Sequence, residues 1–588
     1  MALQIGGLAS GMDINSLVTE MMKAQRTRVD RVQQSRTSLE WKQDAYNEIN
    51  KSFASFIVDS KKEFGLTTTS STGVLLSNSV NSMTWLKNAE SADTDVLSVT
   101  ARADAAKGTY NVKVNSLADN WSAASQEGIS LGEKTDLVSQ FGLEEGDVLN
   151  LTIAGEKGNI NAYGVVTEGK LDLELTITKG EDVSVKTVTE ASLTNFVNQL
   201  NGADVGVRAS YDSGTDRFFI QTDGTGSSKG IIVEDNSSLS GEKLMTGVDN
   251  LLKLAYFDKD SSSYENIESL TAYYGTDAEI DFGAATGIVQ NNNSFVVNGI
   301  NFTLKDVGET TVTVGTDTDS VYEKIKDFVD KYNELVLTSG TKLQEKTNRS
   351  FQPLTDEEKN ALSETEVELW ETKAKSGLLR NDMTIQKTLT DLRSNIFKAV
   401  EGEGISEQYN TLYSVGIDFQ SYFSSSVGGL LEIDEAKLRT AIETDVDAVS
   451  RLFFQEPSSE YNVADDALNA TQLAQKRSES GIVRRIYDDL TQGVKEIVSK
   501  AGVGENASLY RSVNATILLD FVTSQGSIST IDENINDYNR RIDTLNTYFD
   551  KMETRLWNQF TAMEKAISEM NQQSAWLATQ MNGGSSNG

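Results

Sequence analysis

The chain has 588 residues, of which 38% are hydrophobic, and it carries 87 acidic against 53 basic side chains, a formal net charge of −34. Such a length predicts several domains with real hydrophobic cores, and such a charge disfavours binding to nucleic acid or anionic lipid. Histidine and cysteine are both absent, which excludes disulfides, thiol nucleophiles, histidine bases and zinc sites built on these residues.

The charge is concentrated in the middle of the chain. Residues 1–63 hold nine basic and eight acidic side chains, and residues 528–588 hold five and eight, so about −32 of the total lies between them. Nearly neutral ends around an acidic body indicate ends that contact protein and a body that faces water. No segment approaches the roughly 20 apolar residues of a membrane helix, and the N-terminus lacks the pattern of a secretory signal.

The first residues combine glycines with apolar side chains, in IGGLASGMDINSLVTEMM from Ile5. They do not form a phosphate loop, because no strand precedes them and no Gly-Lys-Ser/Thr follows. Alternating steps of four and three then predict a long helix with an apolar stripe interrupted by polar residues. The stripe consists of Val18, Met22, Gln25, Val29, Val32, Arg36, Leu39, Gln43, Tyr46, Asn50, Phe53 and Ile57.

The next part reads as short strands and turns. Strands are predicted at Val96, Gly108, Val148 and Thr311, and hairpins are predicted around residues 212–216 and 298–299. GTGSSKG at Gly224 imitates a phosphate loop, but a strand-like GIIVED follows where a helix N-terminus is needed. The turn at residues 212–216 lacks the oxygen spacing of an EF-hand loop, so a plain hairpin turn is favoured over a calcium site.

Helical patterns return at Ser320, where Ser320 and Glu323 have the spacing of a capping box. They continue through residues 355–375 and from Ile433 to residue 454. The C-terminal part repeats the four-three pattern more strongly, and Thr530 with Glu533 predicts a second capping box at its start. The stripe consists of Ile528, Ile531, Ile535, Tyr538, Ile542, Leu545, Phe549, Met552, Leu556, Phe560, Met563, Ile567, Met570, Ser574 and Leu577.

The two terminal stripes are expected to pair. A helix over residues 528–577 would be about 80 Å long, and an extra step of four near Leu556 should locally unwind any supercoil. We therefore predict an α+β multidomain fold, in which terminal coiled-coil or bundle legs bracket inserted β-rich domains. Apolar groups near both termini then need burial against other subunits. The predicted self-assembly and filament interface is Leu3, Ile5, Leu8, Met12, Leu17, Met21, Met22, Met563, Ile567, Met570 and Leu577.

Several of these segments resemble one known family. GLASGMDINSLVTEMMKAQR from Gly7 resembles the opening of bacterial flagellar filament cap proteins, also called hook-associated protein 2. FVVNGINFTLKDVGETTVTVGTDTDSVYEKIKDFVDKYNEL from Phe295 and LEIDEAKLRTAIE from Leu431 resemble conserved parts of the same family. FVNQLNGADVGVRASYDSGTDRFFI from Phe196 is similar to its flagellin-type insertion motif. Residues 119–289 match least.

The resemblance implies a protein without catalysis or cofactor that leaves the cell through the flagellar export apparatus, with an export chaperone. It would be extracellular, form a ring of copies at the distal tip of the flagellum, and promote folding and incorporation of flagellin. Its partners would be itself, flagellin and other axial proteins, with some host or mucus contact. The implied domains are 1–45 with 535–588, 46–80 with 316–534, 81–125 with 286–315, and 126–285.

Other functions remain open on the sequence alone. A flagellin-like or hook-junction protein would also pair its terminal helices, but it would polymerise instead of closing into a ring. An extracellular adhesin would act through the acidic β-rich domains. An enzyme such as a wall hydrolase would need paired carboxylates in a cleft.

Overall fold

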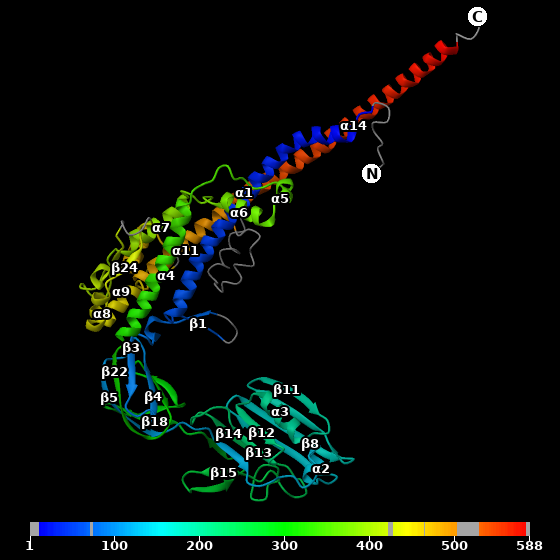
Figure 1. Cartoon of the computed structure of the whole chain (residues 1–588). Coiled ribbons are helices and arrows are strands. Elements are labelled where there is room, and N and C mark those ends of the chain that lie inside the picture. Colours follow the sequence, from blue (N-terminus) through cyan, green and yellow to red (C-terminus); the bar gives the residue numbers. More distant parts are fainter. Residues whose placement is uncertain (1–10, 71–74, 422–426, 464, 503–528, 584–588) are drawn as a thin grey trace. The chain divides into compact units, whose positions relative to one another are not determined.

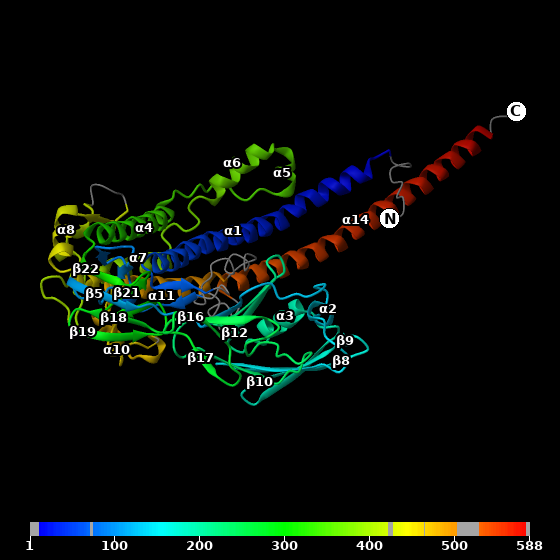
Figure 2. The same cartoon turned by 90° about the horizontal axis from the view of Figure 1, so that it is seen from below.

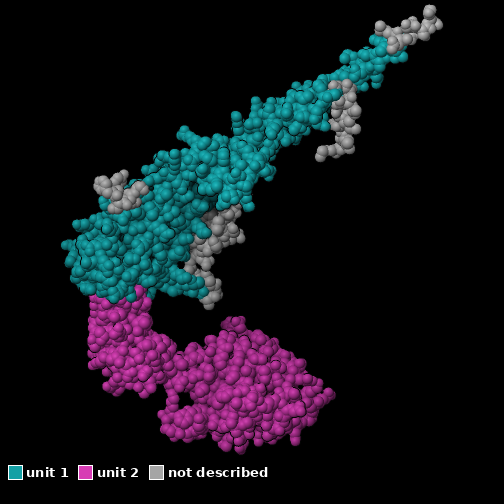
Figure 3. Space-filling model, viewed as in Figure 1, with its two compact units in different colours: residues 1–83, 318–588 teal, residues 84–317 magenta. Residues whose placement is uncertain are grey.

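The computed structural model describes residues 11–70, 75–421, 427–463, 465–502 and 529–583. They fall into two compact units, coloured separately in Figure 3. Unit 1 combines residues 1–83 with 318–588, and unit 2 is the insertion between them, residues 84–317. Both units bring together segments that are distant in sequence. The finer division into four domains stays a prediction.

Helix α1 (Ile14–Glu63) begins unit 1. Asp13 caps it by accepting a hydrogen bond from the Ser16 backbone N–H at 3.0 Å, which satisfies one of the free donors of the first turn. Gly65, at a φ of +75°, follows its C-terminal end and takes the left-handed conformation that commonly ends a helix. All twelve positions of the predicted stripe are buried or half-buried, so the predicted helix and its period are confirmed.

Helix α14 (Thr530–Gly583) is the C-terminal partner of α1. It is continuous through the extra step at Leu556, and its 54 residues give about 81 Å at 1.5 Å per residue. The predicted capping box at Thr530 is wrong by one residue. Ser529 accepts from the Asp532 backbone N–H at 3.1 Å and donates to the Asp532 carboxylate at 2.7 Å. Ile528 of the predicted stripe lies outside the described residues.

The rest of unit 1 is a helical bundle on the C-terminal half of α1. Aromatic rings form part of its core: Phe56 of α1 lies 5.4 Å from Phe328, and Phe64 lies 4.8 Å from Phe454, between ring centroids. Two short antiparallel pairs complete the unit, β1 (Thr67–Thr69) with β2 (Leu75–Ser77) and β23 (Ile417–Phe419) with β24 (Leu431–Ile433). The bundle helices are α4 (Thr318–Gln344), α7 (Met383–Ile396), α8 (Glu435–Thr444), α9 (Val446–Phe454), α10 (Ala470–Glu479) and α11 (Ile482–Ala501).

Two of the predicted helical stretches are interrupted. Residues 355–375 form α5 (Asp356–Ala361) and α6 (Glu364–Lys375), because Ser363 starts a second capping box with Glu366. Asp445 similarly ends α8 and caps α9 by accepting from the Ala448 backbone N–H. Helix α4 begins at Thr318, two residues before the cap predicted at Ser320. Both stretches are helical as predicted, but each divides into two helices, and Ile433, the first residue of the second predicted stretch, belongs to strand β24.

Unit 2 contains two separate β cores. The first is formed by a five-stranded sheet, in the order β19-β18-β5-β22-β3, and a three-stranded sheet, β20-β21-β4. Phe282 and Phe302, one from each sheet, meet edge to face at 5.7 Å. The predicted turn at Asn298 and Gly299 joins β20 (Ser294–Val297) to β21 (Ile300–Leu304), and both residues have positive φ, as a tight hairpin requires. The remaining strands are β3 (Lys87–Ser91), β4 (Leu97–Ala101), β5 (Gly108–Ser116), β18 (Ala278–Phe282), β19 (Ala285–Gln290) and β22 (Gly308–Thr316).

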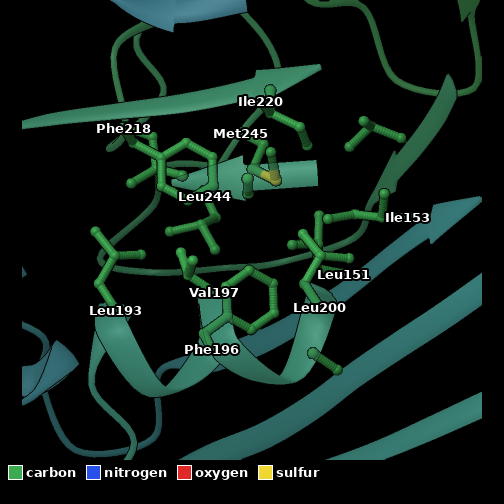
Figure 4. Packing of buried hydrophobic residues seen from close by; sticks show 14 of the residues in the cluster. Leu151, Ile153, Leu193, Phe196, Val197, Leu200, Phe218, Ile220, Leu244 and Met245 are labelled. Carbon is green, nitrogen blue, oxygen red and sulfur yellow. The ribbon is translucent and has the colours of Figure 1, made fainter. Parts of the chain in front are cut away.

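The second core lies between a seven-stranded sheet and a five-stranded sheet, with α3 (Leu193–Ala203) packed against it. Figure 4 shows Phe196, Val197 and Leu200 of α3 among the side chains of both sheets. The first sheet has the order β11-β10-β8-β7-β14-β17 with β9 beside β8, and the second has the order β12-β13-β6-β15-β16. Their elements are β6 (Ser122–Ser125), α2 (Leu137–Phe141), β7 (Val148–Gly155), β8 (Gly158–Thr167), β9 (Lys170–Leu171), β10 (Leu173–Lys179), β11 (Asp182–Val188), β12 (Val207–Asp212), β13 (Arg217–Thr222), β14 (Gly230–Asp235), β15 (Leu254–Asp258), β16 (Ser263–Asn266) and β17 (Ala272–Tyr274).

The predicted turn at residues 212–216 joins β12 to β13, and its Asp216 is held by hydrogen bonds. The carboxylate accepts from Ser130 Oγ at 2.6 Å, from the Ser130 backbone N–H at 2.9 Å and from Tyr211 Oη at 2.7 Å, with Lys134 Nζ at 3.3 Å. Burial alone would raise the pKa of Asp216, but these hydrogen bonds hold that pKa well below its usual range. The turn carboxylate therefore fastens the hairpin to the loop before α2.

Candidate assembly surface on the terminal helices

Helices α1 and α14 pack against each other along an antiparallel seam. Val18, Met22 and Val29 of α1 lie in the same buried cluster as Phe549 and Leu556 of α14. Figures 1 and 2 both show the two helices side by side, α1 in blue and α14 in red. We call the apolar cluster Ile14, Val18, Met22, Val29, Val32, Ile542, Phe549 and Leu556 the terminal seam.

Polar side chains fix the register of the terminal seam. Gln43 Nε2 donates to Asp532 Oδ1 at 2.8 Å and also to the backbone carbonyl of Ala501. Arg36 Nη1 donates to Asn539 Oδ1 at 3.2 Å. Since a shift of either helix would leave these groups unpaired, the polar positions that weaken the heptad pattern specify the alignment.

The C-terminal half of α1 is attached to the bundle through the buried carboxylate of Asp382. Tyr46 Oη donates to Asp382 Oδ2 where α1 approaches α7, and Lys500 Nζ of α11 lies 2.8 Å from the same oxygen. Burial alone would raise the pKa of Asp382, but the hydrogen bonds from Lys500 and Tyr46 lower it. Burial and the neighbouring Asp382 raise the pKa of Tyr46. The arrangement holds a carboxylate ionised in an enclosed site and connects three helices.

Helix α14 continues well beyond the start of α1. Arg26 Nη2 lies 3.7 Å from Glu553 Oε2, and Ile14 is twelve residues before Arg26, so the start of α1 lies opposite about residue 565. Gly583 ends α14 about 18 residues further on, which is about 27 Å of helix. Residues 569–580 are all exposed, and this red end extends past the blue helix in Figures 1 and 2.

The predicted interface residues divide into three groups. Leu3, Ile5 and Leu8 lie outside the described residues. Met22 is 3% exposed and packs inside the terminal seam, and Met563 and Ile567 are half-buried. The residues whose side chains are available on the surface are Met12, Leu17, Met21, Met570 and Leu577, at 39% to 62% exposure.

One residue of this surface was absent from the sequence prediction. Trp576 is 62% exposed and precedes Leu577 on the projecting end of α14. Strict four-three steps select about one residue per helical turn, so an adjacent aromatic side chain falls outside the stripe. The sequence signal that could have found it is the tryptophan directly before Leu577, the last apolar residue of the stripe. We call Met570, Trp576 and Leu577 the distal patch.

The described residues contain no group of three or more Asp and Glu side chains placed to hold a metal ion. Within the same part of the chain, no helix has the length and hydropathy needed to cross a membrane. The terminal helices form a pair whose register is fixed by polar side chains, and the longer helix, α14, presents apolar side chains to solvent at its projecting end.

The architecture defines a class of protein in which paired terminal helices bracket a helical bundle and inserted β cores. Family models for the C-terminal and N-terminal parts of flagellar hook-associated protein 2 match residues 275–572 and 10–120. The first of these spans half of the chain. The chain belongs to the flagellar hook-associated protein 2 family.

Two curated proteins and one solved structure illustrate what the chain is similar to. Flagellar hook-associated protein 2 of Halalkalibacterium halodurans is 28% identical over 590 residues, covering 98% of this chain and 99% of that protein. The protein of the same name from Salmonella typhimurium is 29% identical over 275 residues, 46% of this chain and 47% of its own. A crystal structure of the D1-D2-D3 domains of the flagellar cap protein FliD from Escherichia coli aligns with a TM-score of 0.43 and 19% identity, over 76% of this chain and 95% of that one.

Proposed function

We propose that this protein caps the flagellar filament: copies form a closed ring at the distal tip and promote the folding and incorporation of flagellin, without catalysis. Membership of the flagellar hook-associated protein 2 family supports this function. The observation that carries the mechanism is the projecting end of α14, whose apolar side chains have no cover among the described residues. A ring and a filament end would both supply that cover.

The distal patch offers apolar burial that favours assembly. Burying a large apolar side chain contributes about 1.5–3 kcal/mol, so the three side chains of the patch offer several kilocalories for each copy. In a closed ring every copy gains this burial, and the apolar ridge of Leu17 and Met21 on α1 adds to it. Contacts between subunits would thus bury the projecting end of α14 and the start of α1, while the terminal seam stabilises the helical pair within each subunit.

The proposal includes the route and place of action. The protein would be exported through the flagellar export apparatus with the help of a chaperone and would act outside the cell. Its partners would be other copies of itself, flagellin and other axial proteins of the flagellum. Nucleic acid and membrane lipid are poor partners for a chain with a net charge of −34.

The function is tested by complementation in Halalkalibacterium halodurans lacking its own hook-associated protein 2. The native chain should restore filaments of normal length. A triple variant of the distal patch, Met570→Ser with Trp576→Ser and Leu577→Ser, should be exported but leave short filaments and free flagellin in the medium. A matched control is Leu369→Ser on α6, which also removes an exposed apolar side chain, 61% exposed, from unit 1.

Normal filaments with the triple variant would contradict the role of the distal patch. If the native chain does not restore filaments in Halalkalibacterium halodurans, it either does not recognise that organism's flagellin or does not cap filaments at all. Repeating the test with flagellin from the bacterium that encodes this chain separates the two causes. No capping there would contradict the proposed function itself.

The proposal also includes contact of the extracellular protein with host or mucus surfaces, and unit 2 would make this contact. Binding of the full chain to a mucin-coated surface tests it directly. Retention at physiological salt, reduced by excess unit 2, is expected, and no retention would contradict this part alone.

A further inference from the structure

Strand β11 forms an unprotected edge of the seven-stranded sheet in unit 2. It pairs with β10 over seven consecutive residues without a bulge, and no other described strand pairs with it. Figure 1 shows β11 at the border of this sheet. An edge strand presents a row of backbone N–H and C=O groups with no partner in the sheet, which is a template for pairing with another chain.

The side chains of β11 are exposed on both faces. Six of its seven residues are exposed, and Val183 and Val185 are exposed by 63% and 58%. The register with β10 places Val183 and Val185 opposite Thr178 and Thr176. Valine is a strong strand former, so the strand combines a regular backbone with apolar side chains that nothing in the described chain covers.

Two charged side chains of β11 have no ion-pair partner. Asp182 and Lys186 are both exposed, and no opposite charge of the described residues lies within 4 Å of either. They alternate with Ser184 on one face of the strand, because residues two apart point to the same side. A lysine on an edge strand normally opposes pairing with another strand, unless an acidic group faces it.

We propose that β11 pairs antiparallel with β11 of a second copy, about a two-fold axis at Ser184. In this register Asp182 faces Lys186 of the other copy, Val183 faces Val185, and Ser184 faces itself. Each charge is then matched, each exposed valine meets another valine, and the backbone ladder of the two sheets continues across the axis. Moving the axis to Val185 instead places Asp182 opposite Val188 and Lys186 opposite Ser184, so the sequence specifies one register.

This contact differs from assembly through the terminal helices. It is isologous, since the same strand is used by both copies, and therefore joins copies in pairs. A strand pair is small compared with a stable interface, so the contact is weak between free subunits. It becomes significant where several copies are already held together, because a ring presents several β11 strands at once.

The first experiment uses the absence of cysteine from the native chain. In full-length Ser184→Cys, the two thiols lie on the axis, where directly opposed residues have Cβ atoms about 4.5–5.5 Å apart and a disulfide can form. Thr187→Cys is the matched control: it is on the same strand and also exposed, but the same register holds the two copies of that residue about 20 Å apart. Disulfide-linked dimer is measured on non-reducing gels after mild oxidation of dilute protein.

We expect the Ser184→Cys protein to cross-link at least about tenfold faster than the Thr187→Cys protein, since only the former meets the geometric requirement of a disulfide. Equal rates would overturn the proposal, because collision between unpaired strands does not distinguish the two positions. Faster cross-linking through Thr187→Cys would overturn the register.

Charge reversal tests the same register independently. In the Ser184→Cys background, Lys186→Asp places two carboxylates opposite each other, and Asp182→Lys places two ammonium groups opposite each other. Each reversal should slow cross-linking at low salt, and the double reversal should restore it, because opposite charges face each other again. A double variant as slow as the single ones would overturn the pairing of residues 182 and 186.

Discussion

The buried carboxylate of Asp489 makes the stability of the helical bundle dependent on pH. Its side chain, on α11, is 3% exposed and accepts from Asn395 Nδ2 at 3.1 and 2.9 Å, with Arg477 Nη2 at 3.8 Å. Burial raises the pKa of Asp489 from 3.8 to about 6. The free energy needed to remove the ionised carboxylate from water is larger than the stabilisation that Asn395 and Arg477 give it. The perturbation that tests this is Asp489→Asn.

The magnitude and its sign follow from the two pKa values. The folded protein binds the proton more tightly than the unfolded chain, so the stabilisation from protonated Asp489 is fully present below pH 3.8 and is lost as the pH rises to about 6. This loss is at most about 3 kcal/mol. Asparagine never ionises and keeps an acceptor for Asn395. Asp489→Asn should therefore be about 1–3 kcal/mol more stable than the native protein at pH 7 and nearly equal at pH 4.

The assay is urea unfolding followed by circular dichroism at 222 nm, in half-unit steps from pH 4 to 7.5. Glu443→Gln is the control, because it also removes a carboxylate from the bundle, at an exposed position on α8. Its difference from the native protein, measured at each pH, is the background against which Asp489→Asn is compared. A native-like pH dependence in Asp489→Asn, or lower stability than native at pH 7, would refute the reasoning.

Three further substitutions test other parts of the structure. Phe549→Ala empties a buried position of the terminal seam and should cost unit 1 about 3–5 kcal/mol of unfolding free energy, whereas Met570→Ala should leave it within about 0.5 kcal/mol; equal effects in urea titrations would contradict the seam. Asp216→Asn should cost unit 2 about 1–3 kcal/mol at pH 7. Because the pKa of Asp216 is lowered in the folded state, this difference should shrink as the pH falls through the unfolded value near 3.8, and a constant difference would contradict the ionised network. Gly299→Ala should lower the melting temperature of unit 2, since its φ is +74° and a Cβ would lie 2.5 Å from the backbone nitrogen of Ala105; an unchanged melting temperature would contradict the turn.

The sequence predicted the terminal helices well because one period extends over many residues. The apolar stripe of α1 identified both the helix and its buried face, including the polar positions Gln43 and Asn50. The start of α14 was less predictable. Ser529 and Thr530 are both good capping residues, and only the backbone geometry decides that Ser529 and Asp532 exchange the hydrogen bonds.

The β-rich insertion was predictable only locally. The hairpins at residues 212–216 and 298–299 follow from turn residues between two short strands. The order of strands in the sheets could not be predicted, because β7 pairs with β14 and β6 with β13 across many intervening residues. The edge position of β11 depends on that order, so its unpaired backbone was not visible in the sequence.

Which apolar residues of the terminal helices are exposed was only partly predictable from the sequence. The stripe continues to Leu577 with no sign of where a partner helix ends. Whether an apolar position such as Met22 or Met570 is covered depends on where α1 begins and on its register with α14. The hydrogen bond between Gln43 and Asp532 helps to fix that register.

The most direct test of the account is the mass in solution of the purified full-length chain beside a chain lacking residues 568–588, which keeps the terminal seam but loses the distal patch. Mass photometry over a range of concentrations separates single copies, closed rings and open polymers. We predict a discrete ring, or a pair of rings, for the full chain and single folded copies for the shortened one. A discrete ring that survives the truncation, or open-ended polymers of the full chain, would contradict assembly into a cap through the projecting end of α14.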